Sequence, residues 1–321
     1  MAHSFLRFPS PHGIRVALRA LACALLLGAL LAACGSEPPA PTPCPEPLCP
    51  EPRPCPEPQV HPKAPAQGHL ESIAQRGTLR CGVRDNVIPF GFSDEHTGHV
   101  IGFEVDICRA LAHSLNVRLE LVTVTSSTRI PLLLSGEIDL IAATMTHHNT
   151  RENDLDFSIT YFMDGQKLLV RRGSPIHSAT DLAGHKTAAV QDSWASGTLR
   201  EVQPKVRVKE FAGYAEAFLA LKRGAVEAMT ADSTILLGLK NSDDNTAAWT
   251  IAGDFITDEP YALGLPENDS DFRDYVNLKL QELWLSGEYM KIYNRWFGPH
   301  TKYYLPTDWQ MEIWPGATGK E

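Results

Sequence analysis

The sequence is short of positive charge, of long apolar runs after its first 33 residues and of metal-ligand spacings. It has 29 Lys and Arg against 38 Asp and Glu, a net charge of −9. That balance argues against a nucleic-acid partner or an anionic membrane surface. No later run is long and apolar enough to span a bilayer, so we expect any transport or signalling step to occur on another chain. His147 and His148 are adjacent rather than spaced as metal ligands, and we expect no metal or cofactor.

The first 33 residues are predicted to be an export signal. Arg7, Arg15 and Arg19 precede the apolar stretch 20–33, which is about half the length that spans a bilayer. The stretch ends in Leu-Ala-Ala followed by Cys34, which resembles the lipobox of bacterial lipoproteins, where the chain is cut before the cysteine and that cysteine is lipidated. By that resemblance, the glycine after the cysteine favours the outer membrane of a Gram-negative cell. An ordinary export signal followed by a chance cysteine is the alternative.

Residues 34–69 are rich in proline and repeat Cys-Pro-Glu-Pro at Cys44, Cys49 and Cys55. Such a composition cannot bury a core and favours an extended polyproline II spacer. At about 3.1 Å per residue, the spacer would reach on the order of 100 Å from a lipid anchor. The three cysteines show no histidine or CxxC spacing. We therefore expect oxidation, including disulfides between chains, rather than metal binding.

The segment 125–161 concentrates groups that suit a carboxylate ligand. An apolar helical patch at 130–134 is followed by Ser-Gly, and the near-continuous apolar run 138–143 predicts a parallel strand buried on both faces. Open α/β sheets bind ligands at the carboxyl ends of their strands. The candidate binding residues around that end are Ser126, Arg129, Thr144, Thr146 and Arg151. Guanidinium donors beside hydroxyls suit a carboxylate held by two hydrogen bonds, although each arginine alone is equally consistent with a surface charge.

Another predicted strand precedes this segment, and a third arginine follows it directly. The sequence predicts a helix that ends at Gly77 and then a strand at 79–83. Arg84 follows that strand and therefore faces the same sheet edge as Thr144. A solvated loop charge is the alternative for Arg84.

A helix is predicted to begin at Gly102, with acidic residues in its first turn, and a strand follows at 117–124. We expect this helix to be structural rather than a source of ligand contacts. Cys108 lies on its buried stripe and Cys81 lies on the strand beneath it. The two cysteines are therefore able to form a disulfide or to remain a pair of reduced core residues.

A second strand-loop-helix unit repeats the pattern of the first. The sequence predicts a strand at 187–190, and the segments 133–139 and 221–227 share a helix end, a glycine stop and a strand start at an offset of 88 residues. That offset places Asp232 where Thr144 stands in the first unit. Two units with facing strand ends form a cleft, to which Asp232 would bring a carboxylate. The alternative is that Asp232 caps the helix that follows it.

Together these motifs resemble the extracytoplasmic solute-binding proteins that serve amino-acid ABC importers. The resemblance covers roughly 70–299 and rests on TSSTRIPLL, GEID, TMT, Arg151 five residues after Thr146, DFSITY and the helix that begins at Gly102. TSSTRIPLL is most similar to the glutamate/aspartate-binding branch. The family implies an α/β, two-lobed periplasmic-binding-protein fold of type II, with two βα lobes joined by two hinge strands. The implied divisions are a signal peptide at 1–33, a lipidated cysteine and linker at 34–69, lobe one at 70–162 and 263–321, and lobe two at 163–262.

The resemblance also implies roles for single residues. In the glutamate/aspartate-binding branch, an arginine at the position of Arg84 takes the side-chain carboxylate of the ligand. An aspartate at the position of Asp232 pairs with the ammonium group. In the general family an aromatic residue near Phe90 covers the ligand, although Phe90 is equally consistent with a core residue.

The sequence departs from the family where lobe two would meet the ligand. The segment 191–194, Gln-Asp-Ser-Trp, replaces the usual Gly-Thr-Thr at a helix start, where backbone N–H groups favour an anion. Ser193 keeps a hydroxyl there, whereas the neighbouring aspartate and tryptophan do not follow the pattern. Tyr214 stands where the branch has a histidine, and it would either donate to a side-chain carboxylate or cap its own helix.

The sequence therefore predicts the substrate-binding component of an ABC importer for an acidic amino acid, glutamate or aspartate, working with membrane permease subunits. We expect it in the periplasm, held to the membrane by lipid and without enzymatic activity. One alternative is a dehydratase of cyclic acids such as arogenate or prephenate (a cyclohexadienyl dehydratase), which would need a carboxylic acid of raised pKa. The acids placed near the cleft are Glu104, Asp85 and Asp192, none with an obvious partner. A sensor that uses the same cleft is the other alternative.

Overall fold

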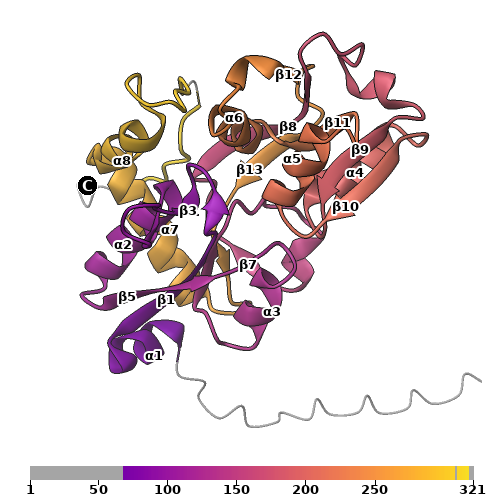
Figure 1. Cartoon of the computed structure of the whole chain (residues 1–321). Coiled ribbons are helices and arrows are strands. Elements are labelled where there is room, and N and C mark those ends of the chain that lie inside the picture. The colour runs from indigo at the N-terminus through magenta and orange to yellow at the C-terminus, as the bar shows by residue number, and fades with distance from the viewer. Residues whose placement is uncertain (1–67, 308, 318–321) are drawn as a thin grey trace, which may run out of the picture. The chain divides into compact units, whose positions relative to one another are not determined.

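Figure 1 shows a computed structural model of the chain, which describes residues 68–307 and 309–317. The predicted signal peptide, the predicted lipidation site Cys34 and most of the proline-rich linker lie outside these residues. The described chain contains two large sheets and one small sheet, with helices between the strands. The predicted α/β class is confirmed.

The first large sheet holds the strands of the first predicted unit. β1 (Thr78–Val83) lies between β5 (Arg118–Thr123) and β6 (Leu140–Ala142) and pairs in parallel with both. β14 (Gly264–Leu265) and β7 (Asp156–Phe157) extend the sheet beyond β6 in antiparallel pairing. Nearly all side chains of β1 and β6 are buried, as expected of strands covered on both faces.

Helices α1 (His69–Arg76), α2 (Phe103–Ser114) and α3 (Arg129–Leu134) pack on this sheet. α2 begins after Gly102, where a Cβ atom would lie 2.1 Å from the carbonyl oxygen of Phe90, so the close approach of two backbones requires glycine. The remaining elements of this part are α7 (Ser270–Leu285), α8 (Glu288–Phe297), the one-turn helix η1 (Arg151–Asn153) and the small sheet of β2 (Asn86–Val87), β3 (Gly91–Ser93) and β4 (Val100–Ile101).

The second large sheet has the order β10-β9-β11-β8-β12. β9 (Lys186–Val190) pairs in parallel with β10 (Arg207–Phe211) and β11 (Ala228–Asp232). β6 starts at Leu140 and β11 starts at Ala228, so the predicted 88-residue repeat is present in the strands. The other elements are β12 (Trp249–Ala252), α4 (Trp194–Val202), α5 (Tyr214–Lys222), α6 (Ser233–Asn241), η2 (Ala179–Leu182) and η3 (Thr246–Ala248).

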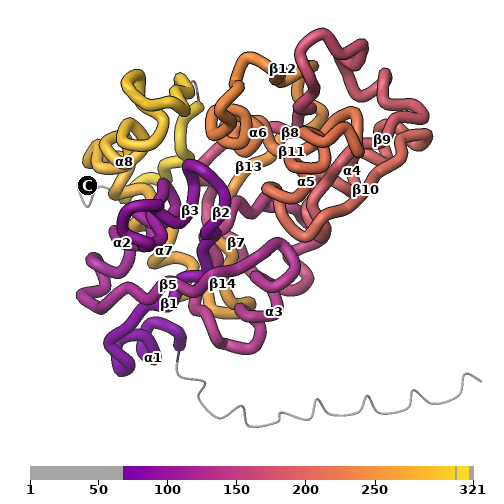
Figure 2. Tube along the Cα trace, viewed as in Figure 1, coloured from indigo at the N-terminus to yellow at the C-terminus, as the bar shows by residue number. Residues whose placement is uncertain are grey.

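Two strands carry the chain between the parts. β8 (Phe162–Arg171) pairs with β13 (Asp258–Tyr261) in its first half and with β11 and β12 in its second half. Figures 1 and 2 show that the early chain lies with α7 and α8, whereas α4, α5 and α6 lie with the second sheet. The chain therefore has two lobes, and lobe one is built from segments on both sides of lobe two.

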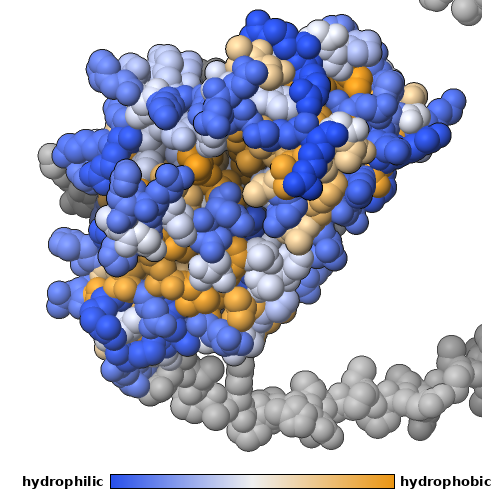
Figure 3. Space-filling view, in the orientation of Figure 1, coloured by the Kyte–Doolittle hydropathy of each residue, from blue (hydrophilic) through white to orange (hydrophobic). Residues whose placement is uncertain are grey.

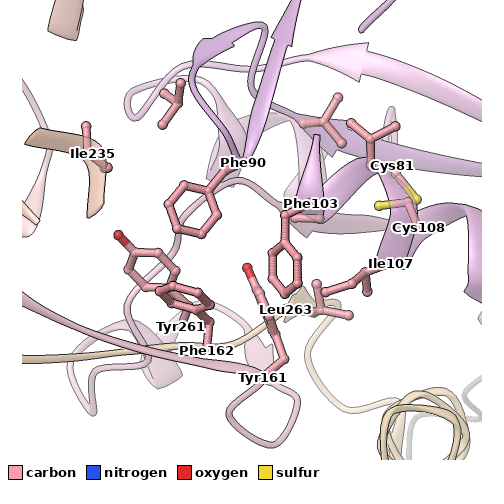
Figure 4. Close-up of a cluster of buried hydrophobic side chains, with 14 of the residues drawn as sticks. Cys81, Phe90, Phe103, Ile107, Cys108, Tyr161, Phe162, Ile235, Tyr261 and Leu263 are labelled. Carbon is pink, nitrogen blue, oxygen red and sulfur yellow. The ribbon is translucent and has the colours of Figure 1, made fainter. Parts of the chain in front are cut away.

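An aromatic core lies beside the crossing strands (Figure 4). The ring of Phe90 is fully buried, with its centroid 5.0 Å from Phe162, 5.5 Å from Tyr261 and 5.4 Å from Phe297. Such edge-to-face packing stabilises a core in addition to the burial of apolar area. Phe90 is thus a core residue, which was the alternative to its expected place over a ligand.

Cys81 on β1 and Cys108 on α2 meet in the same region. Both side chains are buried and both thiols are free, and Figure 4 shows the two sulfur atoms lying next to one another. Burial, with a hydrogen bond to Cys108, raises the pKa of Cys81. The structure therefore describes the reduced pair rather than the disulfide.

The aromatic tail after α8 contacts lobe one. The Trp309 ring lies 5.4 Å from the Trp284 ring of α7, and the Tyr293 hydroxyl of α8 donates to the Leu305 carbonyl at 3.0 Å. Of the tail aromatics, Trp309 packs against the two last helices, whereas Tyr304 and Trp314 are exposed. Within the described part of the chain, no helix has the length and apolar character needed to cross a membrane.

Candidate functional site

The candidate residues follow the carboxyl ends of parallel strands in both large sheets. In the first sheet these residues are Arg84 after β1, Ser126 after β5 and Thr144 after β6. In the second sheet they are Ser193 after β9, Tyr214 after β10 and Asp232 at the end of β11. This edge is where open α/β sheets hold their ligands.

Arg84 and Arg129 are buried cations that form no ion pair with a carboxylate of residues 68–307 and 309–317. Arg84 is 1% exposed and donates from Nη1 to the Ser126 hydroxyl at 3.3 Å. Arg129 is 3% exposed and donates to the carbonyl oxygens of Ala143 at 2.7 Å and Thr144 at 3.2 Å. The Nε atoms of both arginines are buried and have no hydrogen-bond partner. Since the surface-charge alternative requires exposure, it is wrong for these two residues.

The three predicted arginines lie near one another. Burial, followed by the charges of Arg151 and Arg84, lowers the pKa of Arg129 to about 9, so Arg129 stays charged at neutral pH. Arg151 begins η1, donates to the Thr146 carbonyl at 2.8 Å and has a pKa lowered by burial. Among the ion pairs of the described residues, none includes any of the three arginines. A buried cluster of like charges is costly unless an anion joins it.

Asp232 provides a carboxylate opposite this cluster. Its side chain is 8% exposed and accepts a hydrogen bond from the Tyr261 hydroxyl. Burial, and then the negative charges of Glu259 and Asp164, raise the pKa of Asp232 well above its ordinary value. A cationic group placed beside Asp232 would favour its ionised form.

Asp232 occupies the N-cap position of α6, but its side chain makes no capping hydrogen bond. Asp164 of β8 does so instead, because its carboxylate accepts from the backbone N–H of Thr234 at 3.1 Å and from the Ser233 hydroxyl at 2.5 Å. The alternative in which Asp232 caps this helix is therefore wrong.

Two further acids near Asp232, Glu259 and Asp164, were not predicted from the sequence as part of the site. Glu259 on β13 is fully buried and accepts from the hydroxyls of Thr146 and Thr257, both at 2.5 Å. It stands directly opposite Asp164 in the β8–β13 pairing. Burial and the Asp164 charge raise the pKa of Glu259, against hydrogen bonds and Arg151, which lower it. The available signal was the pair of acids, Asp258 and Glu259, that precedes a proline at the start of the second crossing strand.

Glu104, for which the sequence indicated no partner, has two hydrogen-bond partners in the structure. Its Oε1 atom accepts from the backbone N–H of Thr144 at 2.6 Å and from the Tyr161 hydroxyl, so it has the partners that the sequence did not indicate. Its Oε2 atom is buried without a partner. Burial raises the pKa of Glu104 to about 7, despite nearby Arg84 and Arg129. Glu104 therefore lies beneath the arginine cluster and fixes Thr144, whose φ is +46°.

Lobe two contributes two candidate hydroxyls, those of Ser193 and Tyr214, and they differ in their hydrogen bonding. The Ser193 hydroxyl donates to the Val190 carbonyl at 2.6 Å, so its proton is already engaged. Tyr214 is the first residue of α5, after the N-cap Gly213, so it does not cap that helix. The guanidinium carbon of Arg84 lies 5.5 Å from the centroid of the Tyr214 ring. Burial raises the pKa of Tyr214 to about 12, which keeps its hydroxyl protonated as a donor.

A cavity of about 420 Å³ lies beside Tyr214 and is lined from both lobes. Ile88 contributes from lobe one, and Phe218 and Leu239 contribute from α5 and α6. Figure 3 shows apolar residues around a hollow at this place. Elsewhere, His147 stacks on Phe157 at 4.5 Å, and the described ranges contain no group of three His, Cys, Asp or Glu side chains able to hold a metal ion.

Comparisons with known proteins give a consistent family. The model of the bacterial extracellular solute-binding proteins, family 3, matches residues 79–299. The ABC transporter glutamine-binding protein GlnH of Bacillus subtilis (strain 168) is 37% identical over 231 residues, which are 71% of this chain and 84% of that protein. The glutamate/aspartate import solute-binding protein of Escherichia coli (strain K12) is 28% identical over 256 residues, which are 74% of this chain and 83% of that protein. The expected closest likeness to the glutamate/aspartate-binding branch is thus not supported by identity.

Solved structures agree with this result. An ancestral arginine-binding protein bound to glutamine has a TM-score of 0.66 and 36% identity, covering 70% of this chain and 99% of that one. The ancestral amino acid-binding protein AncCDT-1, a precursor of cyclohexadienyl dehydratase, has a TM-score of 0.65 and 31% identity, covering 72% and 99% of the two chains. Both neighbours are amino-acid-binding proteins by their titles.

Proposed function

The chain belongs to the bacterial extracellular solute-binding proteins, family 3, and from that premise we propose that it binds an acidic amino acid, glutamate or aspartate, for an ABC importer. Substrate binding for an amino-acid ABC transporter is the role its relatives share. The acidic ligand is the finer part of the proposal and rests on the charges of the site.

One observation carries this proposal. Arg84, Arg129 and Arg151 have no carboxylate within ion-pair distance among the described residues, although Arg84 and Arg129 are almost fully buried. Anions of the ligand would offset the cost of burying these charges. Two negative groups and one positive group on the ligand would match three guanidinium groups and one acid on the protein.

Each ligand group then has partners. The α-carboxylate would lie between Arg129 and Arg151, beside Thr144. The ammonium would lie at Asp232, because Asp164 rather than Asp232 caps α6. The side-chain carboxylate would lie at Arg84, with the Tyr214 hydroxyl as a second donor. Thr146, whose hydroxyl donates to Glu259, would act by holding that acid rather than by touching the ligand. Ser193 would offer its hydroxyl oxygen and the start of α4.

Glutamine is the second candidate, because relatives named for glutamine binding are more similar to this chain than those named for glutamate and aspartate. Isothermal titration calorimetry with glutamate, aspartate, glutamine and arginine separates the two. We expect the tightest binding for glutamate or aspartate. Tighter binding of glutamine would overturn the acidic assignment and leave the transport role intact. Binding of none of the four would overturn the role.

We propose binding without catalysis. The dehydratase alternative has two points in its favour, the likeness to AncCDT-1 and the raised pKa of Glu104. However, Glu104 is fully buried beneath the site and one of its oxygens holds Thr144 and Tyr161, so it is poorly placed to protonate a substrate. An assay for phenylpyruvate formation from prephenate or arogenate tests this, and turnover would contradict the proposal.

The family description places the protein outside the cytoplasm. We further propose that Cys34 anchors it by lipid, in the outer membrane if the cell is Gram-negative, and that membrane permease subunits receive the ligand. Metabolic labelling with palmitate, compared between the wild type and Cys34→Ser, tests the anchor. Uptake of labelled amino acid in cells that lack the gene distinguishes import from sensing.

A further inference from the structure

The segment that departs from the family, Gln191 to Trp194, makes the contacts between the two lobes at one rim of the site. The Asp192 carboxylate accepts a hydrogen bond from the Ser127 hydroxyl at 2.6 Å. Asp192 adopts a left-handed conformation, with φ of +56°, a region in which aspartate is enriched among residues that carry a side chain. The hydrogen bond to Ser127 is therefore the contact that links Asp192 to lobe one.

Trp194, two residues on, reaches the same lobe-one loop. Its ring centroid lies 3.7 Å from that of His148, with the planes tilted by 33°. The guanidinium carbon of Arg151 lies 5.6 Å from the Trp194 ring. Among the described residues, the Arg151 guanidinium has one hydrogen bond, which it donates to the Thr146 carbonyl. Trp194 is therefore a lobe-two side chain that lies against the Arg151 guanidinium.

All of these partners lie on opposite lobes. Ser127, His148 and Arg151 belong to lobe one, between β5 and β7, whereas in lobe two Asp192 lies in the turn before α4 and Trp194 is the first residue of α4. Contacts of this kind exist only while the lobes are together. They stabilise the closed arrangement without contributing to the encounter of the open protein with its ligand.

We propose that Asp192 and Trp194 form a latch that keeps the lobes closed over the ligand, with Trp194 as a positioning residue for Arg151. The inference rests on the proposed function, since Arg151 is one of the arginines assigned to the ligand. The usual Gly-Thr-Thr pattern has neither a carboxylate nor an aromatic ring, whereas this chain has both. In this chain, the aspartate and tryptophan set how long the ligand stays bound.

The test is stopped-flow binding of whichever amino acid binds the wild type tightest, with the full-length protein and the variants Trp194→Ala, Trp194→Phe and Asp192→Ala. Val202→Ala is the matched control, because Val202 is an exposed apolar residue at the other end of the same helix. We expect Trp194→Ala to raise the dissociation rate roughly three- to thirtyfold, the range of a cation–π contact. The association rate should stay within about twofold of the control, since affinity changes of this kind fall mainly on dissociation. Trp194→Phe, which keeps a ring, should have a smaller effect.

A double-mutant cycle with His148→Ala checks that the contact is made in the bound state, because the two substitutions should then be less than additive in the dissociation rate. A dissociation rate for Trp194→Ala that equals that of Val202→Ala would overturn the latch, and so would a loss confined to the association rate. If the wild type binds no amino acid, the proposed function fails instead. The latch is then decided by small-angle scattering: a larger radius of gyration for the Trp194→Ala/Asp192→Ala protein than for Val202→Ala supports it, and equal radii reject it.

Discussion

The Asp164 carboxylate on β8 caps the first turn of α6 by accepting the backbone N–H of Thr234 at 3.1 Å. A residue of the crossing strand β8 therefore caps α6, although Asp232 occupies the N-cap position in the sequence. Asp232 is left with a hydrogen bond from the Tyr261 hydroxyl and with no capping bond. Because Asp232 does not cap the helix, its buried carboxylate is available to pair with a cationic group of the ligand.

Replacing Asp232 by Asn should abolish most binding and leave the fold intact. We expect the affinity for the amino acid to fall by about a hundredfold or more, since removing one partner of a buried charge pair costs about 2–5 kcal/mol. The free energy of unfolding should change by less than about 1 kcal/mol, because α6 keeps its cap. Calorimetry and urea unfolding measure the two quantities. Asp164→Ala is the control and should show the reverse, a loss of about 1 kcal/mol in stability. Unchanged affinity in Asp232→Asn would remove Asp232 from the site.

Replacing Arg84 by Gln should change which ligand is preferred. If Arg84 takes the side-chain carboxylate, the affinity for glutamate should fall by about a hundredfold, the cost of losing a buried charged partner. Glutamine has a neutral amide at that place, and its affinity should fall by less than about tenfold. Arg129→Gln is the matched comparison and should weaken both ligands alike, because both carry an α-carboxylate. Equal losses for both ligands in Arg84→Gln would show that Arg84 does not select the side chain.

The strand ends of the site were predictable from the sequence. Buried runs of apolar residues marked β1 and β6, and the repeat at 88 residues placed Asp232 opposite Thr144. Arg84 and Thr144 therefore followed from local patterns, because parallel strands present their carboxyl ends at one edge. The same reasoning gave the α/β class and the two lobes.

The acids on the crossing strands were not predictable in this way. Glu259 and Asp164 stand opposite each other only because β8 and β13 pair antiparallel across about a hundred residues of chain, a register that no local periodicity encodes. Phe90 was ambiguous for a related reason. A loop aromatic next to a strand end is equally suited to ligand and core until the rings of Phe162 and Tyr261 are known to surround it.

The ligand-free protein should lose stability relative to a Glu104→Gln variant as the pH rises from about 4.5 to about 7. The carboxyl of Glu104 has a pKa of 4.5 when unperturbed and about 7 in the folded protein. Between these values the folded state binds one more proton than the unfolded state, so stability falls with rising pH. The full difference is about 3 kcal/mol. Gln does not titrate, so the Glu104→Gln variant lacks the part of the pH dependence of stability that Glu104 causes.

Urea unfolding at a series of pH values measures this slope for both proteins. The difference between the two curves isolates Glu104, because all other titrating groups are common to them. Parallel curves across the window would show that the folded protein does not hold Glu104 protonated.

Replacing Gly238 by Ala should block closure of the lobes beside the cavity at Tyr214. A Cβ atom at Gly238 of α6 would lie 2.0 Å from the carbonyl oxygen of Ile88 in lobe one, and a backbone atom cannot move aside as a flexible side chain does. Gly197 of α4 is the matched control, because a Cβ there meets no atom within 4 Å. Both substitutions should raise the stability of their helices by about 0.5–1 kcal/mol, because alanine favours a helix more than glycine does. A difference in ligand binding between the two variants is therefore not caused by helix propensity. We expect Gly238→Ala alone to weaken ligand binding by about tenfold or more and to keep a larger radius of gyration at saturating ligand. Equal affinity and equal compaction in the two variants would show that Gly238 and Ile88 do not touch when the ligand is bound.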